Sequence, residues 1–335
     1  MSKWGRVMAA VLMPLVFTLP LRTAHSAEIR AKFAVTMQED SHQGQGVARF
    51  IELVRQKSGG RIVIKPYYNA ALGNDVQVTS ALQGGSIEFT VPQTSTLTGL
   101  VPQFEALDLP FLFENEAEAE KALDGPPGQK LLELLPPKGL VGLAYWENGF
   151  FSFTNSKHPI TRLEDFSGLK IRAVQSKLSM DTLSALGATP VALPVPEIYT
   201  ALETKTVDGQ STPPAVTYAL KFHEVQKYVS LTNHAYGAFL PLVSKKFWDR
   251  LSEDDRRILV EAARETAAFQ RGIAREKNRL AVRKMEEAGL QANAISPEER
   301  QRMKAATGAI WSGYRKSPEV GPILEEIESF LGRKE

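Results

Sequence analysis

The sequence contains no cysteine among its 335 residues. This absence excludes disulfide bonds, thiolate nucleophiles and cysteine-bound metals, so the fold must be stabilised by an ordinary hydrophobic core. Hydrophobic residues make up 43% of the chain, which is enough for a large core. Because a chain of this length exceeds what one core usually organises, we expect two lobes.

Long apolar runs are also scarce, and only residues 7–21 approach the length of a membrane span. That run is about 15 residues long and is interrupted by Pro14 and Pro20, whereas a spanning helix needs roughly 20 residues. Two basic residues precede the run and a stretch of small, polar residues follows it, as in a secretory signal peptide. We predict a signal peptide at residues 1–26, cleaved near residue 26, and a periplasmic mature protein. An uncleaved membrane anchor is the alternative.

The chain has no excess of basic charge, with 40 Lys and Arg against 38 Asp and Glu. Removal of the leader would take three basic residues with it, and no basic run interleaved with aromatic residues remains. Nucleic acid is therefore not an expected partner. The five histidines are scattered along the sequence, and no nucleophile elbow, zinc-protease motif or phosphate-binding glycine loop is present. We expect no metal, no cofactor and no enzymatic activity, and a periplasmic enzyme on a two-lobed fold is an alternative.

Hydrophobic periodicity predicts two successive α/β units. In the first, strands are expected at residues 28–35, 61–67 and 87–91, with helices at 46–57 and 75–83. The second has expected strands at 168–172, 189–193 and from 207, with helices at 179–186 and 196–205. This alternation predicts mostly parallel sheets covered by helices.

Residues 252–288 contain no proline and only one glycine, Gly272. Ser252 followed by Asp255 resembles a capping box, so we predict a single helix over this stretch. At ~1.5 Å per residue such a helix would span roughly 55 Å, longer than one lobe. We interpret it as a helix that bridges both lobes, with a dimerising coiled coil as the alternative.

Four motifs in the second unit occur in a specific order and spacing. They are GLKIR at 168–172, GATPV at 187–191, EIYTAL at 197–202 and VDGQ at 207–210. Together they resemble the central signature of the TRAP transporter solute-binding proteins of the DctP type, and the likeness covers nearly the whole mature chain. This resemblance implies a two-lobed periplasmic binding protein fold of the α/β class, with mixed sheets, a hinge and a long helix crossing both lobes. We expect lobe 1 to comprise 27–149 plus about 238–277, and lobe 2 to comprise 150–237 plus about 278–335.

The resemblance also implies a function and partners. Proteins of this kind capture a small organic acid and deliver it to a membrane permease with one small and one large integral subunit. We expect this chain to do so as a monomer. A ligand-binding component of a sensory system is the alternative.

Arg172 is the predicted ligand anchor, because the corresponding arginine of the family pairs with the ligand carboxylate. A guanidinium offers a planar fork of donors that fits a carboxylate with two parallel hydrogen bonds. Without the family likeness, a structural salt bridge would be the favoured interpretation of this residue.

The sequence departs from the family pattern at several positions around the expected cleft. A second arginine found in several relatives is missing after Asn148 and Gly149, and position 239, polar in the sialic-acid branch, is a phenylalanine. We therefore expect one carboxylate contact and a ligand with an apolar or aromatic body. The other expected contacts are Phe151, Thr212, Phe239 and Val195, together with the polar residues Gln93, Thr94 and Gln175.

Overall fold

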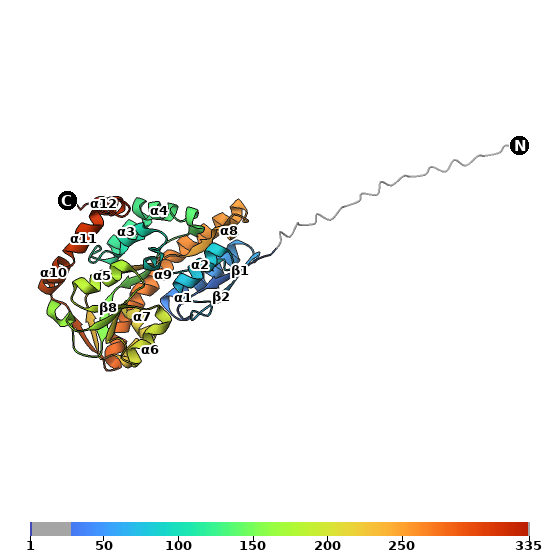
Figure 1. Ribbon diagram of the computed structural model, residues 1–335. Helices are drawn as coiled ribbons and strands as arrows, with labels where there is room; N and C mark the ends of the chain where they lie inside the picture. The colour runs from blue at the N-terminus through green and yellow to red at the C-terminus, as the bar shows by residue number, and fades with distance from the viewer. Residues whose placement is uncertain (2–27, 334–335) are drawn as a thin grey trace.

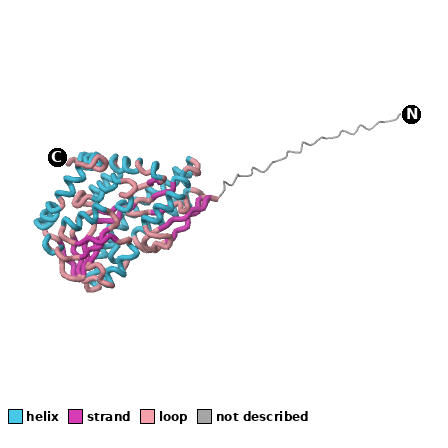
Figure 2. The backbone as a smooth tube through the Cα atoms, viewed as in Figure 1, coloured by secondary structure: helices cyan, strands magenta, loops and turns pink. Residues whose placement is uncertain are grey.

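The computed structural model describes Met1 and residues 28–333, so the predicted signal peptide lies outside the described residues. The strands of the described part form three sheets, of five, six and two strands, and the strands are drawn in magenta in Figure 2. Within that part, no helix combines the length and the apolar character that a membrane crossing requires.

The first lobe is built around a five-stranded sheet with the order β2-β1-β3-β12-β4. Strand β1 runs parallel to both β2 and β3, whereas β12 runs antiparallel to β3 and β4. The strands are β1 (Ile29–Ala34), β2 (Ile62–Tyr67), β3 (Phe89–Thr90), β4 (Leu140–Gly142) and β12 (Leu242–Ser244). A late segment of the chain thus completes a sheet that an early segment begins.

The second lobe contains a six-stranded sheet with the order β13-β10-β6-β9-β7-β8. It is also mixed, because β7 is parallel to β8 and β9 while β6 is antiparallel to β9 and β10. Its strands are β6 (Ser152–Asn155), β7 (Lys170–Ala173), β8 (Thr189–Ala192), β9 (Gly209–Thr212), β10 (Tyr228–Leu231) and β13 (Gln291–Ala294). The predicted α/β class with mixed sheets is confirmed.

A two-stranded ribbon joins the two sheets. Strands β5 (Trp146–Phe150) and β11 (Tyr236–Phe239) pair antiparallel, with a register shift between Gly237 and Ala238. In chain order, β5 lies between β4 and β6, and β11 lies between β10 and β12. Both of these passages between the sheets therefore run through the ribbon, which places it at the hinge.

Helices cover both sheets (Figure 1). On the first lobe they are α1 (His42–Lys57), α2 (Asp75–Gly84), α3 (Glu116–Asp124), α4 (Pro126–Glu133) and α8 (Lys245–Trp248), with the 3-10 helices η1 (Thr94–Leu97), η2 (Pro102–Asp108) and η3 (Pro136–Lys138). On the second lobe they are α5 (Lys177–Ala185), α6 (Ile198–Glu203), α7 (Pro214–Ala219) and α10 (Pro297–Ala306), with η4 (Leu163–Phe166), η5 (Val195–Glu197) and η6 (Phe222–Val225). Helix α1 begins before the predicted residue 46 because the Ser41 hydroxyl accepts the Gly44 N–H and caps it.

Helix α9 (Glu253–Glu287) is a single helix of 35 residues, as predicted, and Ser252 caps its N-terminus. At ~1.5 Å per residue it is about 52 Å long. It packs against α1 in the first lobe and α7 in the second, and its orange ribbon runs diagonally across the molecule in Figure 1. The prediction that one helix crosses both lobes is confirmed.

The C-terminal helices α11 (Gly308–Arg315) and α12 (Gly321–Phe330) return the chain toward the first lobe. Helix α12 packs against η2 and α4, and its residues Ile323, Leu324 and Ile327 belong to the same buried cluster as Phe104 and Leu131. The expected division placed all of 278–335 in lobe 2. The packing of α12 on first-lobe elements differs from that division, because its apolar face is buried there.

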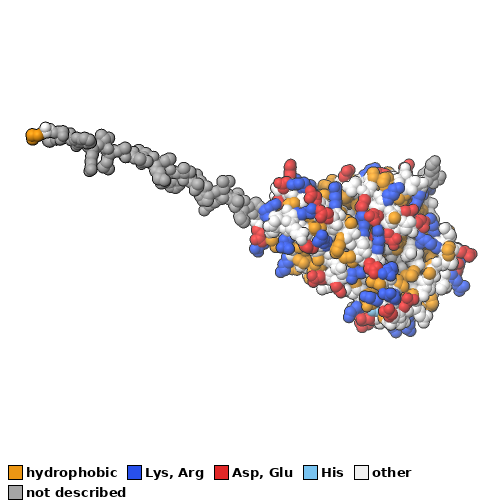
Figure 3. Space-filling model, turned by 180° about the vertical axis from the view of Figure 1, so that it is seen from behind, with side chains coloured by type: hydrophobic (Ala, Val, Ile, Leu, Met, Phe, Trp, Pro, Cys, Tyr) orange, Lys and Arg blue, Asp and Glu red, His pale blue; other side chains and the backbone are white. Residues whose placement is uncertain are grey.

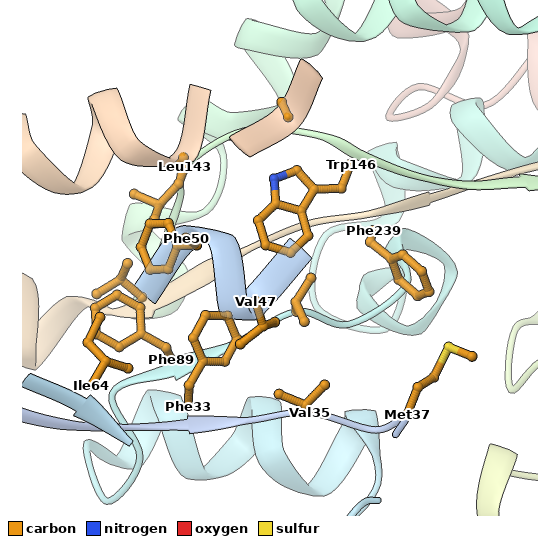
Figure 4. Packing of buried hydrophobic residues seen from close by; sticks show 14 of the residues in the cluster. Phe33, Val35, Met37, Val47, Phe50, Ile64, Phe89, Leu143, Trp146 and Phe239 are labelled. Carbon is orange, nitrogen blue, oxygen red and sulfur yellow. The ribbon is translucent and has the colours of Figure 1, made fainter. Parts of the chain in front are cut away.

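A cluster of aromatic side chains lies at the centre of the first lobe (Figure 4). The Phe89 ring stacks on Phe33, with centroids 5.7 Å apart, and lies 5.9 Å from Phe50 and 5.5 Å from Phe247. These residues come from β1, α1, β3 and α8, so the cluster ties the sheet to the helices on it.

Acidic and basic side chains are interspersed on the face of the molecule in Figure 3.

Two glycines in helices give a matched test of this packing. A Cβ added at Gly46 in α1 would lie 2.9 Å from Trp146 Cζ3 and 2.7 Å from Gln270 Cγ, whereas one at Gly272 in α9 would meet nothing within 4 Å. We expect Gly46→Ala to lower the free energy of unfolding by about 1–3 kcal/mol through overpacking. Gly272→Ala should instead raise it by about 0.5–1 kcal/mol, because alanine has the higher helix propensity. Urea denaturation measures both, and a stabilising Gly46→Ala would contradict the close approach of α1 and α9.

Candidate functional site

A cavity of about 40 Å³ lies between the two lobes beside the hinge ribbon. Its wall contains one arginine, one aspartate, several amides and hydroxyls, and a set of apolar side chains. The lining residues are Thr36, Met37, Gln43, Asn74, Asp75, Gln93 and Thr96 from the first lobe, Asn148 and Phe239 from the ribbon, and Arg172, Val174, Gln175, Pro194, Val195, Thr212 and Val216 from the second lobe. Such a mixture of apolar wall and few placed polar groups is typical of small-molecule sites.

Arg172 reaches the cavity from strand β7 and is only 2% exposed. Its Nε donates to the Leu193 carbonyl at 2.8 Å, which fixes the plane of the guanidinium. Burial lowers the pKa of Arg172 to about 9, and the nearby Asp75 carboxylate opposes this shift. Among the described residues, no carboxylate forms an ion pair with Arg172, and Asp75 is the one whose charge acts on it. A buried cation without an ion-pair partner is costly, so the site is built to receive an anion.

Asp75 lies on the opposite lobe at the first position of helix α2. Its carboxylate accepts hydrogen bonds from the Thr36 hydroxyl and from the Gln93 backbone N–H. Burial raises the pKa of Asp75, while these two hydrogen bonds and the Arg172 charge oppose that increase. The cavity therefore carries a positive group on one lobe and an acidic group on the other.

A chain of amides fixes the first-lobe side of the cavity. His42 Nε2 lies 3.1 Å from Asn148 Oδ1, and Asn148 Nδ2 donates to Gln93 Oε1 at 3.1 Å. Gln93 Nε2 in turn donates to the Ser95 hydroxyl at 2.8 Å. Because each amide is held by its neighbour, their donors and acceptors are oriented before a ligand arrives.

Six of the eight expected contact residues line this cavity: Arg172, Gln175, Gln93, Val195, Thr212 and Phe239. The other two do not. Thr94 is buried, and its hydroxyl lies 3.4 Å from the Ala238 carbonyl oxygen. Gln93 forms an isolated antiparallel β-bridge with Phe239, so the side chain of Thr94, the next residue, points away from the cavity. Phe151 lies between β5 and β6, where its ring meets the edge of His234 at 6.2 Å, and it lines a neighbouring cavity.

Sequence reasoning did not single out Asp75, Thr36 or Asn148 as contacts. Asn74 is an N-cap signal that places the carboxylate of Asp75 at a helix N-terminus, and this signal could have pointed to Asp75. Asn148 was noticed only because the arginine of several relatives is missing nearby. The structure places its amide on the cavity wall.

His234 lies on the wall of the neighbouring cavity that Phe151 also lines, and it is uncharged at neutral pH. Its Nε2 lies 3.1 Å from Ser211 Oγ, its Nδ1 lies 2.7 Å from Thr232 Oγ1, and its ring stacks on Phe153. Burial lowers the pKa of His234 to about 3, and Arg300 contributes to the same shift. In the unfolded chain a histidine binds a proton near pH 6.5. Unfolding therefore takes up a proton between these values, and stability is lost as the pH falls below about 6.5.

We expect His234→Asn to reduce the pH dependence of unfolding. Loss of one proton of uptake lowers the slope by up to about 1.4 kcal/mol per pH unit between pH 4 and 6. His42, whose pKa burial lowers to about 4, would retain its own contribution in the variant. Urea denaturation at several pH values measures the slopes, and above pH 7.5 the two curves should run parallel. Equal slopes at pH 4–6 would show that His234 is protonated in the folded protein.

Two mixed sheets joined by a two-stranded hinge, with a buried arginine facing a cavity between them, define a two-lobed ligand-binding protein. The comparison with known families agrees with that class: the family described as bacterial extracellular solute-binding protein, family 7, matches residues 33–317. The chain belongs to this family, that of the TRAP solute-binding proteins.

Relatives and solved structures show the same likeness. The chain is 35% identical over 330 residues to the C4-dicarboxylate-binding periplasmic protein DctP of Rhodobacter capsulatus, covering 98% of this chain and 94% of that one. It is 38% identical over 256 residues to the 2,3-diketo-L-gulonate-binding periplasmic protein YiaO of Escherichia coli, covering 76% and 78%. The crystal structure of the sugar acid binding protein DctPAm of Advenella mimigardefordensis with galactonate has a TM-score of 0.88 at 39% identity, covering 91% and 98%.

Proposed function

We propose that this chain is a periplasmic solute-binding protein that captures a small organic carboxylate and delivers it to a TRAP-type transporter. The observation that carries the proposal is the environment of Arg172. This residue is buried at the interlobe cavity, and its Nε donates a hydrogen bond to the Leu193 carbonyl. Among the described residues it has no ion-pair partner. A carboxylate would accept two parallel hydrogen bonds from the guanidinium and neutralise its charge.

The ligands of the relatives support this class. A C4-dicarboxylate, a diketo sugar acid and galactonate differ in length and polarity, but each carries at least one carboxylate. The common requirement is one anionic group, which matches the single arginine of the cavity. Gln93, Gln175, Thr212, Val195 and Phe239 would contact the rest of the ligand.

The remaining parts of the proposal concern the context of the protein. Residues 1–26 would direct export and be removed near residue 26, leaving a monomer in the periplasm. Its partner would be a permease with one small and one large integral subunit. The protein would bind and release its ligand without chemical change, and neither a metal nor a cofactor would take part.

A thermal-shift screen of the mature protein tests this function. The screen should include succinate, galactonate and D-erythronate, with the neutral sugar galactose as the control. A ligand at 100 times its dissociation constant stabilises the folded state by about 2.7 kcal/mol, which raises the melting temperature by several degrees. At least one carboxylate should produce this shift and remain chemically unchanged. A shift with galactose alone, or turnover of the ligand, would overturn the proposal.

A further inference from the structure

A second, smaller cavity lies directly next to the first. Its volume is about 30 Å³, and Gln93 and Val174 belong to the walls of both cavities. Both lobes contribute polar groups to it, Ser95 and Asp108 from one side and Ser176, Ser179 and Ser211 from the other. Both cavities therefore lie between the two lobes.

The backbone after strand β7 leads from the first cavity to the second. Arg172 lines only the first cavity, Val174 lines both, and Ser176 lines only the second. The chain bends at Gln175, where the Ser176 N–H donates to the Val174 carbonyl at 2.7 Å, so this segment turns from the first cavity into the second. A ligand whose carboxylate is held by Arg172 would extend along Val174 toward Ser176.

Asp108 is the reason to expect an occupant in the second cavity. Its Oδ2 is enclosed and, among the described residues, has no hydrogen-bond partner, although the Ser95 hydroxyl bonds to the carboxyl group. A buried polar atom without a hydrogen-bond partner destabilises the folded state. A cavity needs only about 10–15 Å³ to hold a water-sized group, so this one has room for a hydroxyl group among the side chains of Asp108 and the serines that line it.

The amide chain of the first cavity continues into the second. Asn148 donates to Gln93, Gln93 donates to Ser95 at 2.8 Å, and Ser95 bonds to Asp108. The orientation of the Gln93 amide is therefore coupled to the state of Asp108. A ligand that filled both cavities would contact both ends of this series of hydrogen bonds.

We propose that the second cavity is a subsite for a hydroxyl group at the distal end of the ligand, bound by Asp108 and by serine hydroxyls of the second lobe. The inference rests on the proposed function, because Arg172 must hold the other end. It assigns the protein to hydroxylated acids that are long enough to reach from Arg172 into the second cavity.

Calorimetry with two aldonates of different length tests this subsite. D-erythronate has four carbons and galactonate has six, and both carry one carboxylate. The wild-type protein should bind galactonate more tightly. Asp108→Asn and Ser179→Ala should each weaken galactonate by about 5- to 50-fold, the effect of one lost hydrogen bond, and change erythronate by no more than about 2-fold. Ser179 provides a second test because its hydroxyl donates no hydrogen bond to the described residues.

The possible failures are distinguishable. Equal losses for both aldonates, or no loss for either, would show that the cavity holds only water and would overturn the subsite. Binding of succinate but of neither aldonate would also overturn it, while leaving carboxylate capture intact. If no carboxylate bound to the wild-type protein, the proposed function itself would fail.

Discussion

Arg172→Ala should weaken the binding of a carboxylate ligand by about 2–5 kcal/mol, or roughly 30- to 5,000-fold, as expected when one member of a buried charge pair is removed. The same substitution should leave the ligand-free protein at least as stable as the wild type. In the ligand-free state Arg172 is a buried cation without an ion-pair partner among the described residues, and its removal relieves a desolvation cost. Isothermal calorimetry and thermal melts measure the two effects.

Two further variants sharpen this test. Arg172→Lys keeps the charge but loses the planar fork, so its affinity should fall between those of the wild type and Arg172→Ala. Arg30→Ala is the matched control, because Arg30 is exposed and forms an ion pair with the nearby Glu28. Unchanged affinity in Arg172→Ala would remove Arg172 from the binding site. A parallel loss in Arg30→Ala would indicate a non-specific effect of charge.

Phe89→Ala should lower the free energy of unfolding by about 3–5 kcal/mol, the usual cost of removing a buried phenylalanine ring. Phe89 is 1% exposed and its ring lies within 6 Å of three other aromatic rings, from β1, α1 and α8. The cavity left by the ring is surrounded by rigid neighbours, so little relaxation is expected. Urea denaturation of the ligand-free protein gives the difference.

Phe269→Ala is the matched control for this stability prediction. Phe269 lies on α9 with 43% of its surface exposed, and the Arg49 guanidinium lies over its ring. The substitution should change stability by no more than about 0.5–1 kcal/mol. Similar losses in both variants would mean that the aromatic cluster does not dominate the first-lobe core.

The sequence predicts the elements whose signals are local. Helix α9 follows from the absence of proline after Ser252 and from the cap that Ser252 provides. Arg172 is different, because its prediction rests on the resemblance to a family and not on its neighbours alone. The structure places it on the wall of the interlobe cavity.

The parts that the sequence does not predict depend on pairing between distant segments. Thr94 turns away from the cavity because Gln93 bridges to Phe239, more than 140 residues later, which periodicity cannot reveal. Phe151 lines the second cavity and not the first, because strand β5 ends at Phe150 and strand β6 begins at Ser152. Asp75 and Arg172 line the same cavity because the two lobes meet there. Neither segment alone predicts that the two residues share a cavity.

Helix α9 has a consequence for how ligand affinity and ligand choice are controlled. Because it packs on α1 in one lobe and on α7 in the other, its contacts contribute to the equilibrium between open and closed forms. The apparent dissociation constant of every ligand is the intrinsic constant divided by the closed fraction. A substitution at the α7–α9 contact therefore scales all affinities by one common factor and leaves their ratios unchanged. Sensitivity to the surrounding solute concentration can thus evolve on this helix, independently of the cavity residues that determine selectivity.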